Sequence, residues 1–124
     1  MTRVNVALLT DEELIERFVA IALEQDYVER MDEPVSEYNP LYDLMEEVEG
    51  ELKSRGGDRR SLLLPLNAHE NAHVRLKAAL ATLAVAPEAS RDVLQKLSDR
   101  NRPPEASNAR RMLRALDEGR YIPT

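Results

Sequence analysis

A five-residue stretch near the middle of the chain has the residue types of a zinc protease. His69, Glu70 and His73 match the pattern H-E-x-x-H. On a helix, two histidines four residues apart project from one face and can both bind zinc, and the glutamate between them can act as a general base toward zinc-bound water. Zinc-dependent hydrolysis is therefore the enzymatic alternative that the sequence offers, with His69 and His73 as candidate metal ligands.

We interpret the same stretch as a turn between two helices. Asn71 is a good N-cap for a helix that begins at Ala72, which would leave His69 outside that helix and break the shared face. Catalytic zinc also needs a third protein ligand, and Glu88 and Asp92 further along the chain have no motif to support them. We therefore take the match to be accidental and expect a protein without catalytic residues, metal or cofactor.

No other stretch has the residues of a familiar catalytic or nucleotide-binding motif. The chain contains no cysteine, which excludes a disulfide scaffold, a thiolate metal site and a cysteine nucleophile. It contains no Walker sequence and no G-x-G-x-x-G either. The candidate sites that remain are two charged surfaces.

Charge is distributed unevenly along the chain. The net charge is −6, yet the first 55 residues carry 15 acids and 5 bases and the remaining residues carry 8 acids and 12 bases. We expect an acidic outer face around Asp43, Glu46 and Glu47 that would steer a basic protein partner.

In the second half of the chain, Arg111 and Arg114 could contact a partner. Together with Arg110, and with Arg100 and Arg102 as further candidates, they could also contact the phosphates of a nucleic acid. The acidic total and the lack of stacking aromatics argue against the nucleic-acid alternative.

Six helical segments are expected to position these residues. Aromatics make up only 4% of the chain, so the core must be built from Leu, Ala, Val, Ile and Met, a set that favours helices over strands. Start signals and apolar stripes place the segments at residues 11–31, 40–55, 58–66, 72–86, 87–99 and 104–118. Short connections between them predict three antiparallel pairs.

Local signals refine the first two of these segments. Thr10 and Glu13 have the spacing of a capping box. Asn39 is a good N-cap, and Pro40 fits the first turn of the next helix because its missing amide is not needed there. The second helix is expected to bury a narrow stripe made of Leu41, Leu44, Met45, Val48 and Leu52, and the fifth to turn inward Ala89, Val93, Leu94 and Leu97.

The stretch from Leu62 to Leu83 resembles one HEAT repeat. It has an apolar first helix that carries Pro65, a short polar turn, and a second helix that begins Val-Arg-Leu-Lys-Ala-Ala at residues 74–79. The acidic residue usual in the turn of such a repeat is missing, and Asn67 or Asn71 stands there instead. The resemblance implies a short HEAT-like α-α superhelix, most evident at residues 58–86.

The whole chain is also similar to a family of small bacterial proteins of unknown function with this HEAT-like second half. The similarity rests on the residues 38–43, on the helix end at 52–57 and on the block at 74–79, and it covers most of residues 10–122. It implies a fold and no activity. HEAT-like stacks generally serve as interaction surfaces, so we expect a non-catalytic protein-protein interaction module with a protein partner.

The remaining expectations concern organisation and location. At 124 residues we expect one helical domain over residues 1–124, with a short tail at 120–124. The longest nearly apolar run is about half of what a membrane span needs, and no secretory signal is visible. These observations, with the absence of cysteine, predict a cytoplasmic protein that has no membrane partner.

Overall fold

A computed structural model describes residues 1–124 and contains helices and no strands. The fold class is therefore all-α, as predicted, and each of the six expected segments is helical. A short additional helix precedes them. The elements are η1 (Val6–Leu8), α1 (Asp11–Arg30), α2 (Val35–Ser54), η2 (Arg59–Ala68), α3 (Ala72–Thr82), α4 (Pro87–Arg100) and α5 (Glu105–Asp117), where η marks a 3-10 helix.

Contacts divide the chain into two compact units, Met1–Leu62 and Leu63–Thr124. The first unit holds η1, α1 and α2, and the second holds α3, α4 and α5. The expectation of one domain over the whole chain stays a prediction. None of the helices carries a stretch that is both long and apolar enough to cross a membrane.

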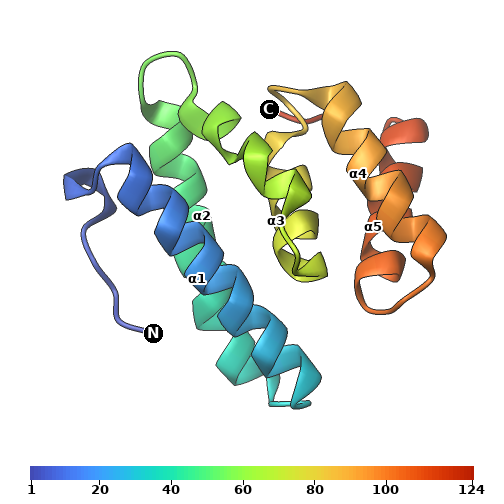
Figure 1. The fold of residues 1–124 in the computed structure, drawn as a ribbon, viewed down its shortest axis with the longest axis horizontal. Helices are drawn as coiled ribbons and strands as arrows, with labels where there is room; N and C mark the ends of the chain where they lie inside the picture. The colour runs from blue at the N-terminus through green and yellow to red at the C-terminus, as the bar shows by residue number, and fades with distance from the viewer. The chain divides into compact units, whose positions relative to one another are not determined.

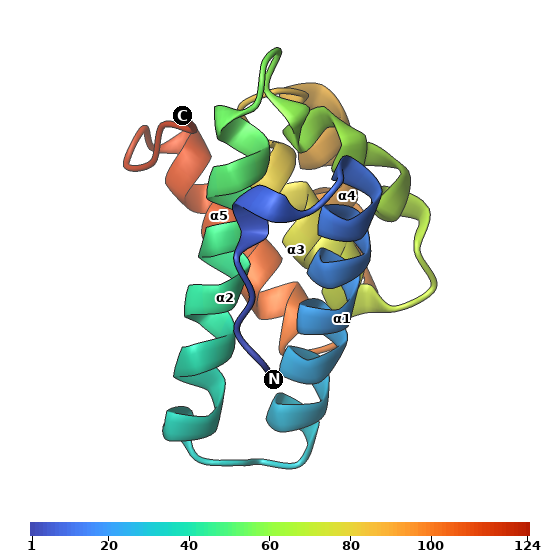
Figure 2. The same cartoon turned by 90° about the vertical axis from the view of Figure 1, so that its left-hand side faces the viewer.

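The first unit is built on a helical hairpin in which α1 and α2 lie side by side (Figures 1 and 2). The predicted capping box at the start of α1 is present. The amide of Glu13 donates to Thr10 Oγ1 at 3.1 Å, and the amide of Thr10 donates to Glu13 Oε1 at 2.9 Å. Two amides that the helix itself leaves without acceptors are thereby satisfied.

Both helices of the hairpin carry buried apolar side chains. Leu14, Phe18 and Ile21 of α1 are completely buried. All members of the stripe predicted on α2 are buried as well, namely Leu41, Leu44, Met45, Val48 and Leu52. Helical spacing was sufficient to predict this stripe, because the opposite side of α2 is rich in carboxylates and the two sides are therefore easy to distinguish in the sequence.

The predicted start of α2 is wrong. The helix begins at Val35, after Pro34, so Asn39 lies inside the helix and is not its N-cap. Pro40 therefore lies in the second turn. Its missing amide removes one backbone hydrogen bond, to the carbonyl of Ser36.

One arginine fastens the end of α2 to the start of α1. Arg55 donates to the carboxylates of Asp11 and Glu51, both at 2.9 Å, and to the carbonyl of Leu9 at 2.7 Å. Arg55 therefore ties the segment before α1 to the open end of the hairpin.

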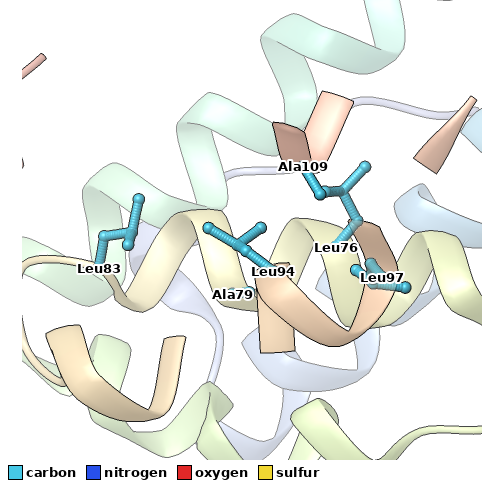
Figure 3. Packing of buried hydrophobic residues seen from close by; sticks show 6 residues of the cluster. All are labelled: Leu76, Ala79, Leu83, Leu94, Leu97 and Ala109. Atoms are coloured by element: carbon cyan, nitrogen blue, oxygen red, sulfur yellow. The ribbon is translucent and has the colours of Figure 1, made fainter. Parts of the chain in front are cut away.

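In the second unit, α4 packs against both α3 and α5. Their shared core consists of Leu76, Ala79, Leu83, Leu94, Leu97 and Ala109 (Figure 3). Next to this core, Ser90 of α4 is completely buried and its hydroxyl lies 2.8 Å from that of Thr82 in α3. Thr82 also donates to the carbonyl of Ala78 at 2.8 Å, so Ser90 is the donor to Thr82.

Three predictions for the second half differ from the structure. The helix expected at 72–86 ends at Thr82, because the chain turns before Pro87, which occupies the first position of α4. Ala89, expected to face inward, is exposed, and the next residue along α4, Ser90, is buried instead. The segment expected at 58–66 is a 3-10 helix, η2, that contains Pro65. A HEAT repeat begins with an α-helix, so the HEAT-like character stays a prediction.

Candidate functional site

The H-E-x-x-H stretch forms the turn before α3. Asn71 is the N-cap of that helix, as predicted: its Oδ1 accepts the amides of His73 at 2.9 Å and Val74 at 3.0 Å. His69 precedes the helix, and its Nδ1 accepts the amide of Asn71 at 3.0 Å. Since His69 and His73 do not lie on one continuous helix, they lack the shared face that a zinc protease motif requires.

Arg75 stabilises the same turn from within α3. Its Nη1 donates to the carbonyls of His69 at 2.6 Å and Glu70 at 3.0 Å. His73 is buried, and one of its ring nitrogens lies within 4.8 Å of a carboxylate oxygen of Glu105 in α5. Within this unit, the acidic residue that lies near His73 is therefore Glu105, which is not part of the H-E-x-x-H stretch. Glu88 and Asp92, weighed as further ligands, are exposed.

Asn71→Ala should lower the free energy of unfolding by about 1 kcal/mol, because two amides at the start of α3 lose their acceptor. Urea denaturation followed by circular dichroism measures this change. Ser107→Ala, an exposed position in the first turn of α5, is the matched control and should alter stability by less than about 0.5 kcal/mol. Equal stability of the Asn71 variant and the control would show that the cap does not contribute.

The acidic face predicted on the second helix is present on α2. Asp43 and Glu46 are exposed, and Glu47 is partly buried. Tyr42 lies among these carboxylates with 49% of its surface exposed. The sequence analysis missed this tyrosine, although its position four residues before Glu46 places both on one side of the helix. We call Tyr42, Asp43, Glu46 and Glu47 the acidic face.

Tyr42 shows how negative the surroundings of the acidic face are. Its pKa is raised above the usual value, first by a hydrogen bond to Glu46 and by the negative charge of that residue, then by burial, and further by the charges of Glu49 and Asp43. A raised phenol pKa means that an additional negative charge is unfavourable here. The negative charges of Glu46, Glu49 and Asp43 that contribute to this shift also favour a positive charge at the same place.

The chain itself places one cation on the acidic face. Arg3 pairs with Glu47 at 2.8 Å, and Arg17 of α1 donates to the carbonyl of Thr2 at 2.7 Å. Figure 2 shows the segment before η1 crossing the hairpin. A cavity of about 290 Å³ lies beside this segment and is lined in part by Arg3 and Asp43. The acidic face can therefore accept a guanidinium group next to open space.

The three arginines of α5 differ from one another in their contacts. Arg110 donates to the carbonyl of Ser98 at 2.7 Å and to Asn101 Oδ1 at 2.6 Å, so it stabilises the end of α4. Arg111 and Arg114 are exposed on α5. Two exposed arginines on one helix are ordinary for a protein surface.

Comparisons with other proteins give a family but no activity. The family described as "Domain of unknown function (DUF2019)" matches residues 12–117. The chain is also similar to the protein RPA1889 from Rhodopseudomonas palustris CGA009, known from a crystal structure. The two are 35% identical with a TM-score of 0.94, and the match covers 98% of this chain and 100% of that one. No curated protein matches the sequence.

Proposed function

Because the chain belongs to the DUF2019 family of domains of unknown function, its function has to be argued from its own residues, and we propose that it is a non-catalytic protein-protein interaction module. The acidic face on α2 is the contact surface in this proposal. The partner presents a basic segment, with lysine or arginine side chains. The observation that carries the proposal is the exposed Tyr42 surrounded by carboxylates.

The composition of the acidic face suits a cationic side chain. Asp43 and Glu46 can accept charge-assisted hydrogen bonds from a guanidinium or ammonium group. The ring of Tyr42 can at the same time attract the cation through its π-face and supply apolar contact area. Tyrosine is also among the residues that contribute most to protein interfaces.

The pair formed by Arg3 and Glu47 supports the same chemistry. Arg3 is 71% exposed and Glu47 33% exposed in this pair. A pair this exposed contributes about 1 kcal/mol or less, so a partner with several basic residues could displace Arg3. The proposal thus requires no rearrangement of the hairpin itself.

The first experiment compares two variants of equal net charge. In the test variant, Asp43→Asn, Glu46→Gln and Glu47→Gln remove the carboxylates of the acidic face. In the control variant, Glu16→Gln, Glu70→Gln and Glu88→Gln remove three exposed carboxylates elsewhere. Each protein is used as bait in native lysate with and without nuclease treatment. The recovered proteins are identified by mass spectrometry, and recovered nucleic acid is detected by gel electrophoresis.

We expect a stoichiometric protein with the unmodified chain and with the control variant, and its loss with the test variant. Binding measured with the purified partner should weaken about tenfold or more in the test variant and should weaken with added salt. Equal recovery by both variants would contradict the role of the acidic face. Recovery of nucleic acid alone, lost on nuclease treatment, would favour the exposed arginines of α5 instead.

A further inference from the structure

A second surface feature, a cavity of about 420 Å³, lies within the second unit. Its lining combines Asn67 of η2 and Arg75 of α3 with five residues of α4, namely Val93, Lys96, Leu97, Asp99 and Arg100. The volume is in the range of cavities that bind small molecules. The acidic face contributes no residue to it.

Helix α4 forms one wall of this cavity, and that wall has an apolar part and a charged part. Val93 and Leu97 are one helical turn apart, and so are Lys96 and Arg100. The helix therefore presents an apolar row and a cationic row next to each other. Leu97 is 4% exposed and belongs to the core of the unit, so the apolar row has a rigid base.

The cavity has an excess of positive charge. Arg75, Lys96 and Arg100 contribute three cations against the single carboxylate of Asp99. Burial is the main cause that lowers the pKa of Arg75, and the neighbouring charge of Arg100 lowers it further against the opposing effect of Glu105. Two guanidinium groups that disfavour each other's charge are stabilised when an anion lies between them.

The existing contacts of these cations leave donors for a ligand. The two carbonyl contacts of Arg75 use only Nη1, and a guanidinium has five N–H donors. Lys96 pairs with Asp92 at 2.9 Å, but both side chains are more than 60% exposed, so that pair is weak. Basic residues near the end of α4 also interact favourably with the helix dipole. That role explains Lys96 and Arg100, but it explains neither the apolar row nor the position of Arg75.

We propose that this cavity binds a small organic phosphate monoester. The phosphate contacts Arg75, Lys96 and Arg100, and the apolar body lies along Val93 and Leu97. A phosphate monoester carries a charge of about −1.5 to −2 at pH 7, which is opposite in sign to the excess charge of the residues that line the cavity. This proposal is independent of the protein-interaction role.

Phenyl phosphate is a suitable test ligand because it has a dianionic group on an apolar ring. Titration of the isotope-labelled chain, followed by NMR, should give saturable shifts at Val93, Leu97 and Arg100 with a dissociation constant of about 1 mM or lower. Inorganic phosphate and phenol, titrated separately, should each bind more weakly. Equal affinity for inorganic phosphate would overturn the role of the apolar row.

Charge-removing variants test the cationic row. Arg100→Gln and Lys96→Gln should each weaken phenyl phosphate about tenfold. Arg102→Gln, an exposed arginine two residues beyond the cavity, should change affinity by less than about twofold. Because all three side chains are exposed, these substitutions leave the fold intact. Shifts that do not saturate, or equal weakening by Arg100→Gln and Arg102→Gln, would overturn the proposal.

Discussion

Phe18→Ala should lower the free energy of unfolding by about 3–5 kcal/mol, a large share of the stability of a domain this size. Phe18 is the largest fully buried side chain of the chain, and aromatics are only 4% of its residues. The other rings of the hairpin, those of Tyr27, Tyr38 and Tyr42, are exposed or only partly buried and do not belong to the fully buried core. Most of the cavity left by the substitution would therefore persist.

Thermal and urea denaturation measure this effect, with an expected fall of the melting midpoint by roughly 10–20 °C. Tyr27→Ala removes an aromatic from the same helix at a position that is 50% exposed, and it should cost less than about 1 kcal/mol. Phe18→Leu retains most of the volume and should lie between the two. A Phe18→Ala cost as small as that of the Tyr27 variant would show that this core is not formed.

Leu94→Ala should destabilise the second unit by about 2–5 kcal/mol. Leu94 is completely buried on α4 within the core shared with α3 and α5. Its neighbours in that core include Ala79 and Ala109, whose side chains are too short to move into the vacated space. The buried hydroxyl contact between Thr82 and Ser90 also opposes a collapse of α3 onto α4. We therefore expect a value in the upper half of the range.

Calorimetry of Leu94→Ala also tests the expectation of one domain. If residues 1–124 unfold as one domain, Leu94→Ala and Phe18→Ala lower the midpoint of the same single transition. Two transitions, each lowered by only one of the variants, would show that the two units unfold separately. Gln95→Ala, exposed on the same helix, is the control for Leu94 and should change stability by less than about 0.5 kcal/mol.

Amphipathic spacing predicted much of the fold because the buried stripes are strongly periodic. The stripe from Leu41 to Leu52 and the caps at Thr10 and Asn71 are local features, and each is present. The start of α2 predicted from Asn39 and Pro40 was wrong, because residues typical of a helix start can also lie inside a helix that begins a turn earlier. The Leu-rich stretch before Pro65 indicated a helix, but periodicity cannot distinguish a 3-10 helix from an α-helix in so short a segment.

The two candidate sites differ in how far the sequence reveals them. The carboxylates of the acidic face are close together in the chain, so their position on one side of the helix followed from helical spacing. The position of Arg3 beside Glu47 depends on how the segment before α1 folds back, and no local pattern encodes that. The cavity brings together Asn67, Arg75 and residues 93–100, whose separation along the chain makes it a purely tertiary feature.

The contact between Arg3 and Glu47 affects how the protein should be handled. Any segment fused ahead of Met1 is tethered a few residues from the acidic face, at an effective concentration that can reach millimolar values. A basic linker or a polyhistidine tag at that end would then compete with a partner as an intramolecular ligand. Baits tagged at the other end avoid this competition, so that a partner has to displace Arg3 but no added basic segment.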